Sequence, residues 1–199
     1  MKILFIADEE WEGYWDYFRK EDFAEIDLIV SCGDLKASYL SFLTTMTSIP
    51  LLYVHGNHDD AYESKPPEGC ICIEDDIFEY EGVRFLGLGG CHRYKEGKNQ
   101  YTEKEMERRV KRLWLKFLQK KGFDILVTHA PAKGMNDQDT MTHKGFEVFN
   151  KLIKKYEPKM FVHGHVHMKY SRDIPREDIA GKTKVINAFS HYTVEIFKE

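Results

Sequence analysis

The chain lacks any apolar segment close to the ~20 residues that a membrane-spanning helix requires. Its N-terminal apolar run, Ile3 to Ile6, is too short for the hydrophobic region of a signal peptide. This run also leads directly into the acidic residues Asp8, Glu9 and Glu10. The sequence therefore predicts a cytoplasmic protein, and we expect no membrane contact.

An excess of positive charge is also missing. The 199 residues include 29 basic and 33 acidic side chains, which gives a formal net charge of −4. No basic field of the kind that attracts duplex nucleic acid is expected, so we predict no such partner. Small anionic substrates stay compatible with this balance, because bound cations would supply positive charge locally.

Cysteine is scarce, and its spacing matches neither a C-x-x-C pair nor a small disulfide framework. We interpret the four residues as reduced thiols: Cys32, Cys70, Cys72 and Cys91. Linkers, internal repeats and low-complexity segments are absent as well. Since 42% hydrophobic content is enough for a substantial core, we predict a single domain over residues 1–199. The oligomeric state stays open.

What the sequence does contain is a series of short apolar runs typical of buried strands. The expected strands are residues 2–7, 27–31, 51–54, 83–88, 125–128, 160–162 and 185–187. Helical patterns lie between them at residues 14–20, 37–47, 103–121 and 146–156. Residues 77–80 and 83–88, joined by Glu81-Gly82, indicate a β-hairpin, and the chain beyond Val166 also favours strands.

The helix expected over residues 103–121 has two further signals. Thr102 and Glu105 have the spacing of a capping box at its start. Its apolar residues form one predicted stripe, which consists of Val110, Leu113, Trp114, Phe117 and Leu118. The overall order is βαβαβ, then strands, then αβαβ, then strands again. This order favours an α/β fold with two sheets packed face to face and helices outside.

Five polar clusters recur in a fixed order, each at the end of an expected strand. They are Asp8-Glu9-Glu10, Gly33-Asp34, Gly56-Asn57-His58-Asp59, Thr128-His129 and Gly164-His165-Val166-His167. Strand ends of this kind meet at the carboxyl edge of a sheet, where α/β folds bind ligands. Carboxylate, amide and imidazole groups together suit Mn²⁺, Fe or Zn²⁺ better than Mg²⁺ alone. The pattern predicts a two-metal site for phosphoester hydrolysis.

These clusters resemble the signature of the calcineurin-like metallophosphoesterases: D-x-H, G-D, G-N-H-[DE], a later His and G-H-x-H. The match runs from Asp8 to His167, nearly the whole of the expected fold. The resemblance implies a four-layer α/β/β/α sandwich with two mixed β-sheets. It also implies two divalent metal ions, most readily Mn or Fe, with Zn, Ni or Mg also compatible.

The resemblance assigns roles to individual residues. Asp34 would bridge both metals. Asp8 and His167 would complete one site, and the other would be completed by Asn57, His129 and His165. His58 would be the catalytic histidine, and Asp59 would orient its imidazole. The implied reaction is in-line attack on phosphorus by a hydroxide that bridges the two metals.

The chain departs from the family pattern at one position, where Glu10 replaces the histidine of the first motif. As a metal ligand, Glu10 would exchange a neutral nitrogen for a charged oxygen and favour a harder ion such as Mn²⁺ or Fe²⁺. The alternative is that Glu10 points away from the metals, since Glu9 and Glu12 make the whole loop acidic.

Substrate contacts have weaker signals. Arg93 follows a turn after a strand and is a candidate phosphate clamp, with an exposed structural arginine as the alternative. His143 lies in the long segment 130–144 and is a candidate donor to a leaving group, with a solvated loop histidine as the alternative.

Three functions compete at this point. The first is a phosphodiesterase or phosphomonoesterase for a small phosphoester substrate. The second is a non-catalytic protein-binding scaffold with a degenerate metal site, similar to the retromer subunit of this fold. The third is a repair-type nuclease, which lacks support because no extra domain or basic DNA stripe is evident. Protein Ser/Thr phosphatases extend the second motif to G-D-x-V-D-R-G, whereas here Leu35-Lys36-Ala37-Ser38 follows Asp34. The sequence selects neither the substrate nor the type of ester.

Overall fold

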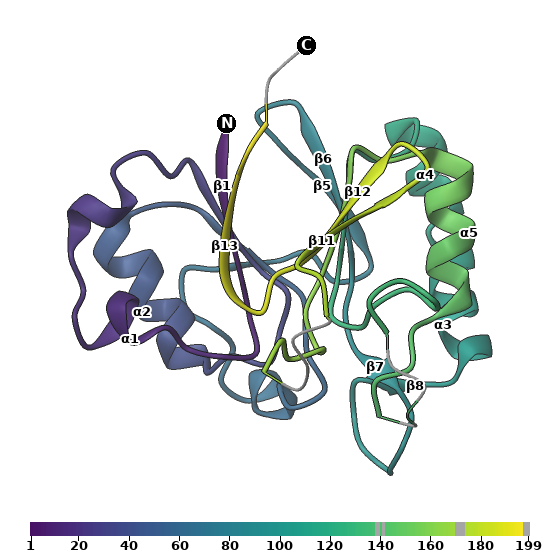
Figure 1. The fold of residues 1–199 in the computed structure, drawn as a ribbon, viewed down its shortest axis with the longest axis horizontal. Helices are drawn as coiled ribbons and strands as arrows, with labels where there is room; N and C mark the ends of the chain where they lie inside the picture. Colours follow the sequence, from purple (N-terminus) through teal and green to yellow (C-terminus); the bar gives the residue numbers. More distant parts are fainter. Residues whose placement is uncertain (138–139, 141, 170–173, 197–199) are drawn as a thin grey trace.

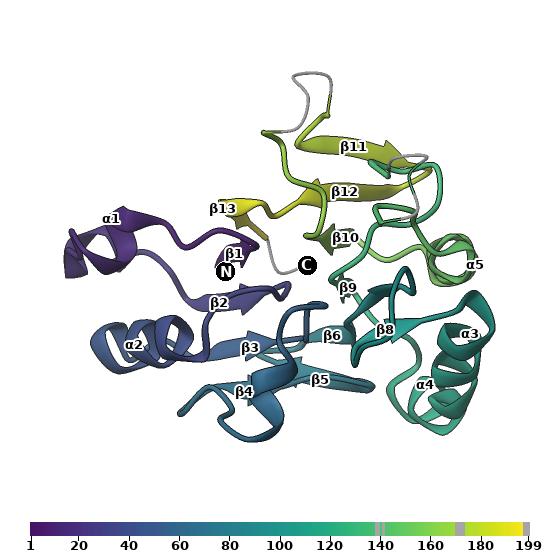
Figure 2. The same cartoon turned by 90° about the horizontal axis from the view of Figure 1, so that it is seen from below.

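Two β-sheets packed face to face form the centre of the protein, and helices cover the outer face of each (Figures 1 and 2). We describe a computed structural model for residues 1–137, 140, 142–169 and 174–196. The order of layers is helix, sheet, sheet, helix. This arrangement confirms the predicted α/β/β/α sandwich.

The first sheet has five strands in the order β13-β1-β2-β3-β4. Their bounds are β1 Lys2–Ala7, β2 Leu28–Ser31, β3 Leu51–Tyr53, β4 Ile71–Cys72 and β13 Ser190–Glu195. Strands β1 to β4 are mutually parallel, and β13 is antiparallel to β1. The outer face of this sheet is covered by helices α1 (Glu12–Trp15) and α2 (Ala37–Thr47) and by the 3-10 turn η1 (Lys20–Phe23).

The second sheet has six strands in the order β11-β12-β10-β9-β6-β5. Their bounds are β5 Asp76–Tyr80, β6 Val83–Leu88, β9 Ile125–Thr128, β10 Met160–His163, β11 Glu177–Ala180 and β12 Thr183–Asn187. The outer strands β5 and β11 run antiparallel to their neighbours, and the inner four are parallel. Helices α3 (Glu103–Arg112), α4 (Trp114–Lys120) and α5 (Glu147–Tyr156) cover its outer face. A short pair, β7 (Cys91–His92) and β8 (Gln100–Tyr101), and the 3-10 turn η2 (Asp60–Glu63) complete the fold.

The inner strands are apolar on both faces because the inner part of each sheet is buried on both sides. In β1, Phe5 points into the core between the sheets, and its neighbours Leu4 and Ile6 point towards the α2 side. In β9, Val127 lies in the core between the sheets, and Leu126 packs towards α3 and α5. This alternation of side chains explains the short continuous apolar runs.

Most of the predicted elements are confirmed. Helix α2 has the predicted bounds, and β5 and β6 form the predicted hairpin. The capping box is also present: the Glu105 amide donates to Thr102 Oγ1 at 3.3 Å, and the Thr102 amide donates to Glu105 Oε2 at 2.8 Å. Among the described helices, none combines the length and apolar character that crossing a bilayer requires.

Two helix predictions were wrong. Residues 14–20 are not one helix, because the chain leaves α1 after Trp15 and turns so that Phe18 packs against Phe23 and Phe42. The helix expected over residues 103–121 is interrupted at Leu113, whose amide bonds to the Val110 carbonyl and whose ψ is 2°. The interruption buries Leu113, and the predicted apolar stripe therefore does not form one continuous surface that faces the core.

Candidate metal centre

The metal-ligand candidates lie where five parallel strands from both sheets end. Asp8 follows β1, Asp34 and Asn57 lie in the loops after β2 and β3, His129 follows β9, and His165 follows β10. Figure 2 shows β1 and β2 beside β10 and β9, so the loops after these strands can meet across the sandwich. Residues more than 150 positions apart in the sequence are in contact here.

Three of these residues have left-handed backbone conformations. The φ angles are 64° for Asp8, 58° for Asp34 and 66° for His165. Residues other than glycine seldom adopt this region, and such conformations concentrate at functional sites. Each turns the chain sharply just after a strand and directs a polar side chain across the strand ends.

The centre of the cluster consists of Asp34, His129 and His165, whose potential ligand atoms lie within 4.8 Å of one another. His129 Nε2 is 3.4 Å from Asp34 Oδ2 and 3.1 Å from His165 Nδ1. It is also 3.0 Å from the side-chain oxygen of Asn57. His129 is fully buried, and Asn57 and His165 are nearly so.

The second nitrogen of each imidazole has its own partner. His129 Nδ1 lies 2.8 Å from the Cys32 carbonyl, and His165 Nε2 lies 2.6 Å from the Thr142 carbonyl. A carbonyl only accepts hydrogen bonds, so these two nitrogens carry the ring protons. In the neutral rings, the lone pairs of His129 Nε2 and His165 Nδ1 then face each other beside two acceptor oxygens. Such a convergence of acceptors requires a cation or an added proton, and this donor set fits a transition metal.

The pKa values show the same concentration of acceptors. Burial lowers the pKa of His129, but the Asp34 carboxylate outweighs burial and raises it to about 9. Burial raises the pKa of Asp34, but the neighbouring His129 charge and hydrogen bond outweigh it and hold that pKa well below its usual range. For His165, burial and then the charge of His129 lower the pKa to about 3. The Asp34 carboxylate, whose side chain is 10% exposed, is therefore ionised and stabilised by positive charge beside it.

A second group of contacts joins Asp8 to the Gly164–His167 loop. The His165 amide donates to both carboxylate oxygens of Asp8, at 3.0 and 2.9 Å. His167 Nε2 lies 3.6 Å from Asp8 Oδ1. A Cβ at Gly164 would come within 2.8 Å of Asp8 Oδ2, so glycine is what allows this close approach. The structure thus brings Asp8 next to His165 and His167, while the division of the candidates into two ligand sets stays a prediction.

The two catalytic candidates have different surroundings. The His58 amide donates to Asp34 Oδ1 at 2.7 Å, and the His58 side chain is exposed. Asp59 is only 4% exposed, and its Oδ2 accepts hydrogen bonds from the amides of Asp34 and Gly56 at 2.8 and 2.7 Å. Burial, followed by the charge of Asp34, raises the pKa of Asp59 to about 6. These contacts make Asp59 a support for the loop backbone and differ from the expected contact with the His58 imidazole.

Glu10 lies beside an open depression next to the cluster, which we call the His58 depression. Its volume is about 670 Å³, and its lining includes Asp8, Asp34, His58 and Lys65. The Glu10 carboxylate contacts both the amide and the Nζ of Lys36, each at 3.3 Å. This contact corresponds to the alternative in which Glu10 points away from the metals, and metal binding by Glu10 stays a prediction.

The two substrate-contact candidates lie in different places. Arg93 pairs with Glu105 at the start of α3, at 2.9 Å, and also contacts the Gln100 carbonyl at 3.3 Å. It lines a separate pocket beside α3. The His143 ring instead lies 5.3 Å from the His165 ring, centre to centre. The structure therefore brings His143, and not Arg93, next to the metal-ligand candidates.

Sequence reasoning did not find three side chains that contact this region. Tyr94 Oη accepts a hydrogen bond from Asn57 Nδ2 at 3.3 Å. Lys36 and Lys65 line the His58 depression. Lys36 could have been predicted to lie near the site, because it is only two residues after Asp34. Tyr94 and Lys65 lie outside every motif, and only the folded loops bring them here.

The chain belongs to the calcineurin-like phosphoesterase family, whose model matches residues 1–169. The recognised motifs all lie within this range. No functionally curated protein matches the chain. Membership implies divalent-metal chemistry on phosphoesters, which agrees with the His/Asp cluster.

Solved structures with similar folds support the architecture. TT1561 of Thermus thermophilus is 17% identical with a TM-score of 0.62, covering 95% of this chain and 89% of that protein. A further crystal structure is 18% identical with a TM-score of 0.67, covering 97% and 94%. A candidate 5′-nucleotidase from Staphylococcus aureus, in complex with alpha-ketoglutarate, is 11% identical with a TM-score of 0.51, covering 98% and 51%. At these identities the similarities show the fold alone.

Proposed function

We propose that this protein is a metal-dependent phosphoesterase that hydrolyses a phosphodiester or a phosphomonoester. The observation that carries the proposal is the buried convergence of lone pairs from Asp34, Asn57, His129 and His165. A fold would not bury these acceptors against one another unless a cation or proton compensated them. Family membership supplies the reaction class.

The residues divide into two ligand sets. Asn57, His129 and His165 would hold one divalent ion, and Asp8 and His167 the other, with Asp34 between them. Mn or Fe suits this mixed set of three oxygen and three nitrogen donors. When bound, the ions would activate water and neutralise the charge of the phosphoryl group. Glu10 would add a hard ligand only if it released Lys36.

His58 is the proposed proton donor to the leaving oxygen. Its amide is fixed to Asp34, and its exposed imidazole can face a substrate in the His58 depression. Asp59 would act indirectly, because its carboxylate fixes the amides of Asp34 and Gly56. The lining of the same depression combines Lys36 and Lys65 with five carboxylates, so bound cations would supply most of the positive charge that attracts an anionic phosphoester.

The test is hydrolysis of a chromogenic phosphodiester, the matching monoester and a panel of nucleotides by chelator-stripped protein. Mn²⁺, Fe²⁺, Ni²⁺, Zn²⁺ and Mg²⁺ are restored one at a time, and bound metal is measured in parallel. We expect His58→Ala to lower turnover about 100-fold or more while metal content stays unchanged. His191→Ala is the matched control, because the His191 ring packs on Trp11 and Tyr14.

Full activity of His58→Ala with metals bound would remove His58 from the mechanism. Absence of turnover across all substrates, with two metals bound, would favour the alternative of a protein-binding scaffold. Failure to bind any of the five ions would contradict the metal centre itself.

A further inference from the structure

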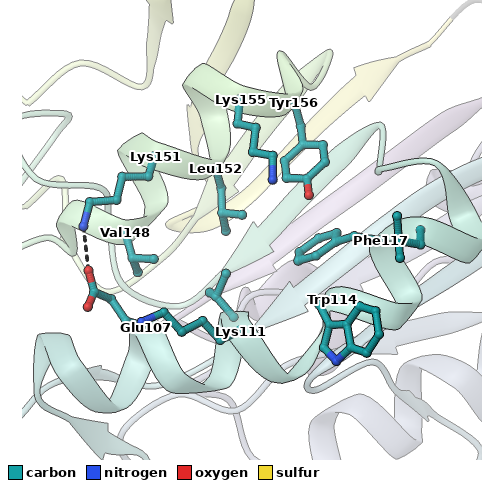
Figure 3. A pocket seen from close by; sticks show the side chains of 11 residues that line it. Glu107, Lys111, Trp114, Phe117, Val148, Lys151, Leu152, Lys155 and Tyr156 are labelled. Atoms are coloured by element: carbon teal, nitrogen blue, oxygen red, sulfur yellow. Dashed lines mark hydrogen bonds and ion pairs between the residues drawn. The ribbon is translucent and has the colours of Figure 1, made fainter.

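An apolar groove lies on the outer helical layer, away from the metal centre. Helices α3 and α4 form one wall and α5 forms the other (Figure 3). We call it the α3–α5 groove; its volume is about 770 Å³, and its apolar lining includes Val110, Trp114, Phe117, Leu118, Leu152 and Tyr156. This size is typical of a site that binds a partner group rather than of a packing defect.

The groove exposes large apolar side chains to water. Trp114 is 58% exposed and Leu118 is 67% exposed. Their exposure follows from the interruption at Leu113, because that residue turns into the core while the next turn of α4 faces outward. Phe117 from α4 and Tyr156 from α5 stack on each other at 4.9 Å and so join the two walls. An exposed tryptophan beside leucine and aromatic groups is the composition of an interaction surface.

The charge around the groove has one predominant sign. Among the side chains that line the groove, three are basic and one is acidic, although the whole chain is acidic at −4. Lys111, Lys151 and Lys155 lie on the rim. Glu107 is the acidic residue among the lining side chains, and Lys151 already pairs with it at 2.5 Å. The rim therefore carries a net positive charge.

We propose that the α3–α5 groove binds an amphipathic helix of another protein, with an apolar stripe that faces the groove and acidic residues along both flanks. A concave surface between two helices fits a convex helical ridge. The basic rim selects acidic flanks. Since α5 has ten residues, the groove is about 15 Å long and accommodates about three turns of helix.

A second copy of this chain does not supply such a helix among its described residues. Helix α2 contains no charged residue, and α3 and α5 are predominantly basic. Two grooves facing each other would bring like charges together. The occupant is thus expected from a different protein.

The probe is an acetylated and amidated peptide of about 12 residues, with leucines at i, i+3, i+4 and i+7 and glutamates on the flanks. Binding to the full chain is followed by fluorescence anisotropy of the labelled peptide. We expect Leu118→Glu to weaken binding about 10-fold or more, since it puts a charge in the groove. Leu115→Glu is the matched control: Leu115 is on the same helix and 50% exposed, but it does not line the groove.

A peptide with lysine in place of every glutamate should bind about 10-fold more weakly, because it meets the lysine rim. Equal binding of both peptides, equal effects of the two variants, or no binding of the acidic peptide would overturn the proposal. A second test is binding to phosphatidylserine vesicles. If Leu115→Glu and Leu118→Glu weakened this binding equally, the proposal would also be overturned, because a flat membrane contacts the whole exposed face of α4.

Discussion

The candidate metal centre and the α3–α5 groove differ in how they are stabilised. In the metal centre, polar groups are buried and bonded to one another or to backbone, as for His129 with the Cys32 carbonyl. In the groove, apolar groups such as Trp114 and Leu118 remain exposed. The fold therefore depends strongly on the loops around the metal centre and little on the groove. Mutations should separate the two regions by their effect on the free energy of unfolding.

The largest effect is expected at Glu74, which supports the loop that contains Asn57. Its carboxylate accepts hydrogen bonds from the amides of His55 at 3.0 Å and Gly89 at 2.7 Å, and it pairs with the buried Arg109. Glu74→Gln should lower the free energy of unfolding by about 3 kcal/mol, because it breaks a buried ion pair. Urea unfolding at neutral pH measures the change. Glu79→Gln, which breaks the exposed pair with Lys120, should cost less than about 1 kcal/mol.

The same residue predicts a pH dependence. Burial raises the pKa of Glu74, but the His55 hydrogen bond and the Arg109 charge outweigh burial and hold it at about 2, below the ordinary value of 4.5. A lowered carboxyl pKa stabilises the fold above about pH 4.5 and loses that contribution as the pH falls towards 2. Glu74→Gln should therefore show a shallower loss of stability in this range. Parallel curves for the two proteins would contradict the assignment.

How far the sequence predicted these regions depends on the range of the interactions. The strands and the motif loops were predictable because apolar runs and strand-end polar residues are local signals. The ion pair between Glu74 and Arg109 was not predictable, because Arg109 lies far away in the sequence, on a helix that contains none of the motifs. Likewise, the Tyr94 contact with Asn57 arises between two loops.

The interruption at Leu113 shows a different limit. The periodicity of residues 103–121 fits one continuous helix as well as it fits two shorter ones. Only the packing of Leu113 into the core under α3 favours the interrupted form. The Glu10 contact with Lys36 is similar, because the sequence permits both a metal ligand and an ion pair. Local pattern defines candidates, and tertiary contacts choose among them.

An intermediate effect is expected at Asp59. Asp59→Ala removes the acceptor for the amides of Asp34 and Gly56, and should cost about 2 kcal/mol because buried amides lose their partner. Asp59→Asn keeps a carbonyl oxygen in the same position and should recover most of this loss. Thermal unfolding of the two variants checks the order. Equal destabilisation by Ala and Asn would mean that the negative charge, rather than the hydrogen-bond acceptor, supports the loop.

The smallest effect is expected in the groove. Leu118→Glu should change the free energy of unfolding by less than about 0.5 kcal/mol, because Leu118 is 67% exposed and loses little buried area. Turnover in the proposed phosphoesterase reaction should also stay unchanged. Urea unfolding and the hydrolysis assay on the same preparation measure both quantities. A loss above about 1 kcal/mol would show that Leu118 stabilises the fold after all. The contrast between a candidate metal centre that supports the fold and a groove that does not would then fail.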